Sequence, residues 1–247
     1  MHSLWPNSSS EELSDLALEQ VYAYPDGLDR PWLQANFVSS LDGAVTVGGM
    51  SSPLTGPGDQ RVLNIHRDLA DVLLVGATTA RVERYPGLKP NEARDERRAR
   101  LQLSPLPPIA VVSGRCSVTP DSPLLTDTVV PPIVLTCADS LASRREALTA
   151  AGADVVIVGQ DQVDLAAALA ELDKRGLRRI NCEGGPRLFG NLIAADLVDE
   201  LCLTVSPQAA AGDGGRIANG PVLPDLRRFQ LSAVVRDGDF LMLTYRR

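Results

Sequence analysis

The chain has 247 residues, of which 44% are apolar and only 4% aromatic, and it carries a formal net charge of −7. This length allows one large α/β domain or two small ones, and the abundance of Val, Leu and Ala favours helices packed on a sheet over an aromatic-rich β-sandwich. The acidic balance argues against nucleic acid as a partner.

The sequence shows no pattern typical of a membrane segment or a metal site. No apolar run approaches the roughly 20 residues that span a bilayer, and the polar N-terminus does not resemble a signal peptide, so we expect a soluble, cytoplasmic protein without a membrane partner. His2 and His66 are the only histidines, and neither lies in a pattern of nucleophile and base. Without CxxC or Cys/His spacing, we expect no metal and no disulfide framework among Cys116, Cys137, Cys182 and Cys202.

Residues 1–30 are expected to form an extension that precedes the main domain. Ser9 and Glu12 have the spacing of a capping box and predict the start of a helix. The Pro-Asp-Gly sequence at 25–27 predicts the turn that ends this extension.

The rest of the chain alternates between strand and helix patterns. Short apolar runs predict strands at 32–38, 72–75, 109–112, 133–136, 155–158, 180–182 and 201–205. Helical patterns follow at 57–69, 78–84, 140–151, 165–174 and 188–195. An Asp-Gly pair between apolar runs at 231–235 and 240–245 predicts an antiparallel hairpin. We therefore expect one α/β domain over 31–247.

The basic run from Arg94 to Arg100 is the only concentration of positive charge. Acidic residues interrupt it, and we interpret it as a solvated helix face or a mobile loop.

Two turns that follow predicted strands have the composition of an anion-binding site. Glu183-Gly184-Gly185-Pro186 opens one helix, and Gly76-Ala77-Thr78-Thr79 opens another. Glycines let the backbone approach a ligand closely, and the free N–H groups at a helix N-terminus attract phosphate. The presence of two such turns in one chain suggests a nucleotide cofactor.

Several motifs occur in an order that is typical of one enzyme family. They are Asn36–Gly43 (NFVSSLDG), Thr55-Gly56 before a helix that contains Arg67, Gly76–Pro86, Glu183–Pro186, Leu197–Leu201 and Ser206-Pro207. Together they resemble the reductase (C-terminal) domain of the bacterial bifunctional riboflavin-biosynthesis deaminase–reductase, which has a dihydrofolate-reductase-like fold. The resemblance covers residues 31–245, and no zinc-deaminase motif accompanies it.

The resemblance implies a mixed, mostly parallel sheet with flanking helices, a homodimer, and reduction of 5-amino-6-ribosylaminouracil 5′-phosphate by NADPH. It implies a substrate site at Ser51, Arg67 and Glu183. Asn36, Asp42 and Glu183 are the residues expected to surround the reacting atoms. Together, the resemblance and the composition of the turns assign cofactor binding to Ser39, Pro53, Gly76, Ala77, Thr79, Glu83, Ser113, Arg115, Gly184, Gly185, Pro186, Arg187, Leu188 and Phe189.

The residue types themselves support some of these roles and leave alternatives open. Arg67, near a helix end, could bind a substrate phosphate through two parallel bonds, or could form a surface pair with Asp68 or Asp71. Ser113 and Arg115 could bind the 2′-phosphate of NADPH, or could lie in an ordinary exposed turn.

Three further observations leave the reaction itself open. Asp42 precedes a glycine and could be only a turn residue. Asn36 stands where the family usually has lysine, and 87–90 lacks the arginine that the family tends to carry. A dihydrofolate or pterin reductase and a non-catalytic NADP-binding protein therefore remain alternative functions.

Overall fold

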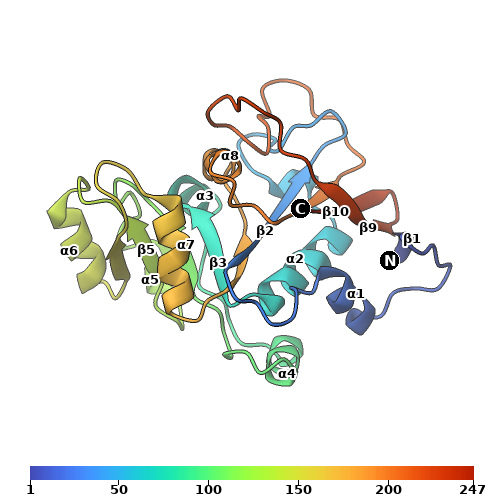
Figure 1. The fold of residues 1–247 in the computed structure, drawn as a ribbon, viewed down its shortest axis with the longest axis horizontal. Helices are drawn as coiled ribbons and strands as arrows, with labels where there is room; N and C mark the ends of the chain where they lie inside the picture. The colour runs from blue at the N-terminus through green and yellow to red at the C-terminus, as the bar shows by residue number, and fades with distance from the viewer.

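A single ten-stranded sheet runs through the protein in the computed structural model, which describes residues 1–247 (Figure 1). The strands are β1 (His2–Trp5), β2 (Trp32–Ser39), β3 (Val72–Gly76), β4 (Ile109–Val112), β5 (Ile133–Thr136), β6 (Asp154–Ile157), β7 (Arg179–Cys182), β8 (Glu200–Val205), β9 (Gln230–Asp237) and β10 (Phe240–Arg246). Their spatial order is β1-β9-β10-β8-β2-β7-β3-β4-β5-β6.

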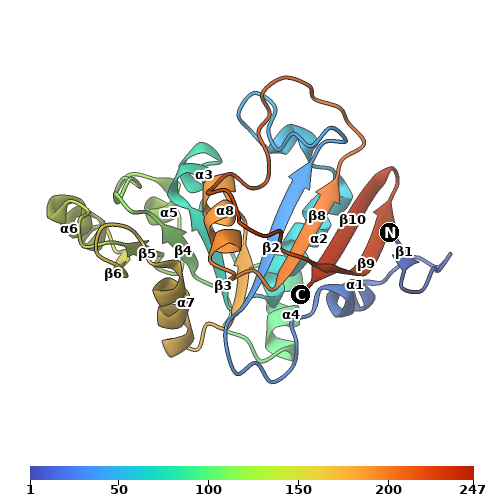
Figure 2. The same ribbon diagram turned by 45° about the horizontal axis from the view of Figure 1, so that its top comes forward.

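The sheet is parallel from β8 to β6 and antiparallel at its other end. β2 pairs in parallel with both β7 and β8, and β3 pairs in parallel with β7 and β4. The hairpin of β9 and β10 joins the sheet antiparallel to β8, as Figure 2 shows. The predicted α/β fold, with a mostly parallel sheet and a C-terminal antiparallel hairpin, is confirmed.

Helices cover both faces of the sheet. They are α1 (Asp15–Tyr22), α2 (Pro57–Leu69), α3 (Ala77–Val82), α4 (Glu92–Arg100), α5 (Pro123–Thr126), α6 (Ala142–Ala150), α7 (Leu165–Lys174) and α8 (Pro186–Ala194), with a 3₁₀ turn η1 (Ser52–Leu54). No helix combines the length and the apolar character that crossing a membrane would need.

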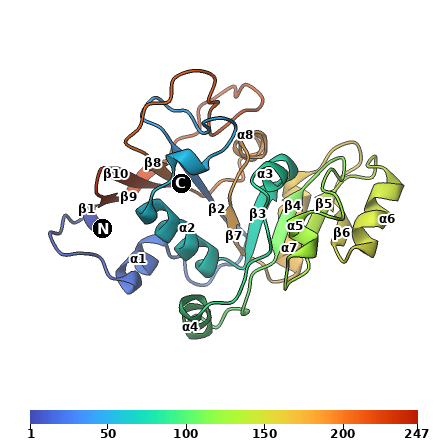
Figure 3. The same cartoon turned by 180° about the vertical axis from the view of Figure 1, so that it is seen from behind.

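Alternating side chains of the strands divide the core between the two faces. On β3, Leu73 and Val75 belong to the core under α1 and α2, whereas Val72 and Leu74 belong to the core under α7 and α8. Figure 3 shows α1 and α2 from behind. Cys182 and Cys202 are buried core residues, as predicted.

The N-terminal 30 residues are tied into the same sheet and helical layer. β1 pairs antiparallel with β9, and α1 packs against α2. The helix predicted to start at Ser9 is wrong in position, because it begins at Asp15 after the N-cap Ser14. Glu12 instead contacts the N-terminal ammonium group of Met1 at 3.2 Å, which removes it from a capping box.

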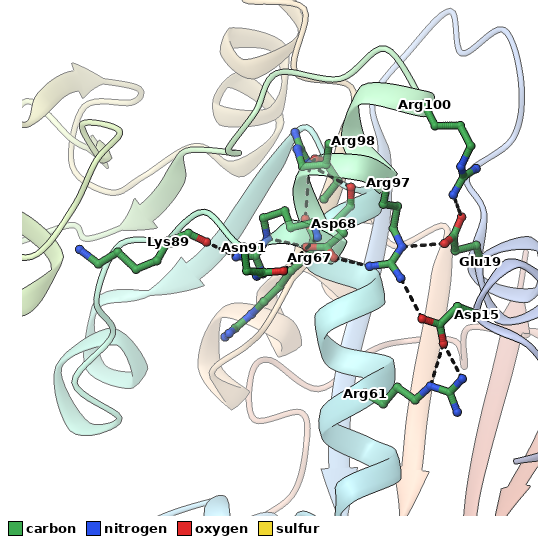
Figure 4. A network of polar contacts seen from close by, with 12 residues as sticks. Asp15, Glu19, Arg61, Arg67, Asp68, Lys89, Asn91, Arg97, Arg98 and Arg100 are labelled. Atoms are coloured by element: carbon green, nitrogen blue, oxygen red, sulfur yellow. Dashed lines mark hydrogen bonds and ion pairs between the residues drawn. The ribbon is translucent and has the colours of Figure 1, made fainter.

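The basic run 94–100 is helical but is not a solvated face. Arg94 and Arg97 on α4 are buried and both bind the carboxylate of Asp68, and Arg97 Nε also donates to Glu19 at 2.7 Å (Figure 4). Arg98 is fully buried and donates to the Asp68 and Ala70 carbonyl oxygens at 3.0 and 2.7 Å, at the end of α2. The interpretation as a solvated face fails because these counter-charges come from α1 and α2, far away in the sequence.

A buried polar chain crosses the core beneath α2. The Gln34 amide nitrogen donates to the Tyr22 carbonyl oxygen at 3.3 Å and to Glu200 at 3.0 Å. The Gln34 amide oxygen therefore faces His66 Nδ1 at 2.6 Å and accepts a hydrogen bond from this nitrogen. His66 Nε2 is buried without a hydrogen-bond partner. Burial lowers the pKa of His66 to about 3, and the folded protein therefore holds this histidine neutral.

We expect this neutral histidine to make the protein acid-sensitive. An unfolded chain takes up a proton on histidine near pH 6.5, so between pH 6.5 and about 3 the unfolded state binds more protons than the folded state. The contribution is complete above pH 6.5 and decreases by about 1.4 kcal/mol per pH unit below it, or about 2 kcal/mol at pH 5. Chemical denaturation at neutral pH and at about pH 5 should show wild type losing about 2 kcal/mol more than His66→Gln. His2→Gln is the matched control, and equal losses in wild type and His66→Gln would contradict the expectation.

Candidate active site

The two glycine turns predicted from the sequence lie against each other at the carboxyl edge of the sheet. β7 and β3 are neighbours, and beyond them the Gly76 N–H donates to the Gly184 carbonyl oxygen at 2.7 Å. A Cβ atom added to Gly185 would lie 2.2 Å from Thr79 Oγ1, and one added to Gly76 would lie 3.3 Å from the Gly185 nitrogen. A side chain at either glycine would crowd the other turn, and the two glycines thus bring the N-termini of α3 and α8 together.

A cavity of about 230 Å³ opens beside these turns. It contains predicted site residues from four different segments of the chain. Its lining includes Asn36, Phe37 and Val38 of β2, Val45, Thr46, Gly49 and Ser51 of the following loop, Thr55, Asp59 and Leu63 at α2, Thr78, Thr79 and Val82 of α3, and Glu83, Tyr85 and Glu183.

Glu183 and Arg67, both predicted to bind substrate, form a two-pronged ion pair at this cavity. Arg67 Nε and Nη2 donate to the two Glu183 carboxylate oxygens at 2.8 and 2.7 Å. The Tyr85 hydroxyl and the Asn181 side-chain amide also donate to Glu183, at 2.8 and 3.0 Å. Neither surface pair considered for Arg67 forms, because Asp68 binds α4 and Asp71 accepts from the backbone N–H groups of 178 and 179.

The charges of this cluster depend on one another. Burial alone would lower the pKa of Arg67, but the Glu183 carboxylate outweighs it and raises the pKa. Burial, and then the Glu183 charge, raise the pKa of Tyr85 well above its usual value. Tyr85 is therefore held as a neutral donor and Arg67 as a cation.

Ser51 and Glu83, predicted for substrate and cofactor respectively, contact each other. The Ser51 backbone N–H and hydroxyl both donate to Glu83 Oε1 at 3.0 Å, and this joins the loop after β2 to the end of α3. Pro53 lies next to them in η1 and is exposed, and its carbonyl oxygen accepts from Gln208 at 3.0 Å.

Asp42 lies away from this cluster. Its carboxylate accepts a hydrogen bond from the Ser40 hydroxyl. It also accepts from the backbone N–H groups of Ala210 and Ala211, at 3.1 and 2.7 Å respectively. These bonds lower the pKa of Asp42 to about 2. With Ser39 it lines a different cavity of about 410 Å³. A role in catalysis for Asp42 stays a prediction, and the contacts show a residue that ties the loop after β2 to the loop after β8.

The remaining predicted cofactor residues lie around the same edge of the sheet. Ser113 follows β4, is buried, and accepts from the Ser117 N–H at 2.9 Å, while Arg115 is exposed. On α8, Arg187 is exposed, Leu188 is buried, and Phe189 packs on Phe37 with ring centroids 4.6 Å apart. Ala77 is buried at the start of α3.

Sequence reasoning gave no role to Asp59 or Tyr85. Tyr85 stood inside a recognised motif, but its contact with Glu183 spans 98 residues of sequence. For Asp59 a signal was present, since Asp59, Leu63 and Arg67 are spaced by four and therefore share one face of a helix.

The fold and this edge of the sheet define a reductase-like α/β protein. The structure of a pyrimidine reductase-like protein from Corynebacterium diphtheriae covers 93% of this chain and 98% of its own length, with a TM-score of 0.79 and 25% sequence identity. The chain belongs to the RibD C-terminal domain family, whose model matches residues 31–242.

Curated relatives agree with this assignment. The 2,5-diamino-6-ribosylamino-4(3H)-pyrimidinone 5′-phosphate reductase of Archaeoglobus fulgidus is 27% identical over 220 residues, which are 88% of this chain and 98% of the relative. The protein of that name from Methanothermobacter thermautotrophicus is 26% identical over 230 residues, covering 87% of this chain and 98% of the relative. The predicted family and the predicted reductase class are confirmed.

Proposed function

We propose that the protein uses NADPH to reduce a ribosylaminopyrimidine 5′-phosphate, either 5-amino-6-ribosylaminouracil 5′-phosphate or its 2,5-diamino-pyrimidinone counterpart. The observation that carries this proposal is the cluster of Arg67, Tyr85 and Glu183, because Tyr85 and Glu183 line the cavity and Glu183 directly precedes the Gly184–Gly185 turn. The cluster offers a guanidinium group for a phosphate, and the turn offers backbone N–H groups for a pyrophosphate.

The residues present fit a nicotinamide cofactor. Asn36 Nδ2 is buried beside the cavity without a hydrogen-bond partner, and the Gly76 and Gly185 turns approach so closely that a Cβ added to Gly76 would lie 3.3 Å from the Gly185 nitrogen. When bound, NADPH supplies the hydride. We assign its pyrophosphate to the Gly184–Gly185 turn and to the Thr79 hydroxyl.

The protein's part is to bind and orient the substrate. Arg67 holds Glu183 through Nε and Nη2, which leaves Nη1 for the substrate phosphate. Glu183 accepts four hydrogen bonds, two on each oxygen, so its part is to position the Arg67 guanidinium and the Tyr85 hydroxyl for the substrate. We assign the proton that the reduction requires to water entering the cavity.

NADPH oxidation, followed by absorbance, tests this function with three substrates. Oxidation with either ribosylaminopyrimidine phosphate supports the proposal. Oxidation with dihydrofolate alone would instead assign a folate or pterin reductase, the first alternative. NADPH binding without oxidation of any of them would assign a non-catalytic NADP-binding protein.

We also propose that Ser113 and Arg115 select NADPH over NADH through the 2′-phosphate. Arg115 is exposed at the end of β4, next along the sheet edge from β3. Arg115→Ala should weaken NADPH binding roughly 10-fold and leave NADH binding unchanged, because one charge-assisted contact is lost. Calorimetric titration of both cofactors measures this, and Arg30→Ala, at an exposed arginine far along the chain, is the control. Parallel weakening of both cofactors would contradict the assignment.

We further propose a cytoplasmic homodimer that has a small-molecule substrate and no nucleic-acid or membrane partner, as in the family it resembles. Light scattering after gel filtration should give twice the 26.4 kDa of one chain.

A further inference from the structure

Helix α2 carries three functional positions on one face. Asp59, Leu63 and Arg67 are spaced by four residues, so they lie above one another along the helix. Asp59 and Leu63 line the cavity, and Arg67 binds Glu183 at the cavity wall. The eight residue steps from Asp59 to Arg67 span about 12 Å of helix. A ligand lying along this face would therefore meet a cation at one end and a carboxylate at the other.

Asp59 differs from the other buried acids in having no cation. Ion pairs with arginines neutralise Glu19, Asp68, Glu183 and Glu200. Asp59 is only 6% exposed, and it forms no ion pair.

Hydroxyl groups alone partner this carboxylate. Thr55 Oγ1 donates to Asp59 Oδ2 at 2.8 Å, and the Thr204 side chain is a second partner. Burial raises the pKa of Asp59, and the two threonine bonds only partly offset this. A buried carboxylate beside a cavity, without a counter-charge, is a site for a ligand that brings N–H donors.

We propose that Asp59 makes the enzyme select a pyrimidine with an amino group at C2, next to a ring N–H, over a pyrimidine with a carbonyl at C2. This inference rests on the proposed function and decides between its two substrates. In the 2,5-diamino-pyrimidinone, the C2 amino group and the N3–H are adjacent donors that can bond the two oxygens of one carboxylate. In the uracil, the C2 carbonyl oxygen would face the carboxylate as a second acceptor, and one bond is replaced by repulsion.

The rest of the cavity agrees with this orientation. With its phosphate at Arg67, an extended ribosyl phosphate places its base toward the Asp59 end of α2. Asn36 Nδ2 is a buried donor without a partner at the same cavity, and the C4 carbonyl oxygen beside N3 is an acceptor of the matching kind. The Asp59 carboxylate thus supplies the acceptors, and Asn36 Nδ2 supplies the donor, that match the edge of a 2-amino-4-oxopyrimidine.

The test compares kcat/KM for the two substrates in wild type and in Asp59→Asn. Wild type should prefer the 2-amino substrate on the order of 100-fold, because a site built for an N–H donor rejects the analogue that lacks it. Asp59→Asn presents an N–H of its own, so the preference should fall at least 10-fold, with NADPH affinity unchanged. Asp95→Asn, at an exposed position on α4, is the matched control.

A purely structural role for Asp59, in the first turn of α2, would give a different result. Asp59→Asn would then lower the unfolding temperature and reduce both activities equally, and an unchanged preference would overturn the inference. If Asp59→Asn does not fold, Thr55→Val removes one hydroxyl that orients the carboxylate and should reduce the preference in the same direction. Wild-type enzyme that oxidises NADPH with neither substrate would overturn the proposed function instead, and with it this inference.

Discussion

Replacing Gly185 with valine is expected to weaken NADPH binding at least 100-fold, a loss of about 2.7 kcal/mol. The Cβ of any larger residue would lie 2.2 Å from Thr79 Oγ1, so the added side chain would displace the hydroxyl to which we assign a pyrophosphate contact. Glycine is needed here because the Thr79 hydroxyl, near the start of α3, occupies the position that a Cβ would take. Calorimetric titration with NADPH measures the loss, and the unfolding temperature shows whether the fold persists.

The smaller change Gly185→Ala identifies the cause of that loss. In the wild-type background the added methyl group meets Thr79 Oγ1, whereas in a Thr79→Ala background this oxygen is absent and the nearest Thr79 atom, its Cβ, is 3.6 Å away. A double-mutant cycle should therefore show strong coupling, with Gly185→Ala costing far less once Thr79 is alanine. Additive effects, or NADPH affinity of Gly185→Val equal to that of wild type, would contradict the role of this turn.

The accuracy of the sequence predictions followed how local each signal was. Helix α2 covers the predicted residues 57–69, and α7 covers 165–174, because Pro57, the Asp164 cap and Gly176 fix their ends through neighbouring residues. Strand β1 was not predicted, because only its pairing with β9 defines it, and β9 lies more than 200 residues away in the sequence. Likewise, the arginines of α4 look solvated until Asp68 and Glu19 come into contact with them.

In the candidate site, too, the sequence indicated individual residues, whereas the contacts between them depend on the fold. Family motifs named Arg67 and Glu183 separately, but the ion pair between them depends on α2 and the end of β7 meeting at the sheet edge. The absence of a cation near Asp59 could not be read from the sequence, because it is a property of the surrounding fold. The spacing of Asp59 from Arg67 could have been read, since both lie within one predicted helix.

Glu183→Gln is expected to reduce kcat/KM by roughly 100- to 1,000-fold, or about 3–4 kcal/mol. Each Glu183 oxygen accepts from Arg67 and from one further donor, so either orientation of the glutamine amide turns an N–H group toward Arg67. Arg67 would lose the pair that positions it, and its half-buried charge would be left uncompensated. Steady-state kinetics with the ribosylaminopyrimidine phosphates measures the effect.

Two comparisons separate catalysis from stability at this pair. Glu171→Gln removes a half-buried surface carboxylate that pairs with Lys174 and Arg175, and it should change neither activity nor stability by more than about 1 kcal/mol. The double variant Arg67→Met/Glu183→Gln removes the stranded charge, so it should regain stability toward that of wild type while activity stays low. If activity returned together with stability, the pair would serve only the fold. If Glu183→Gln kept kcat/KM within 10-fold of wild type, Glu183 would have no part in holding the substrate.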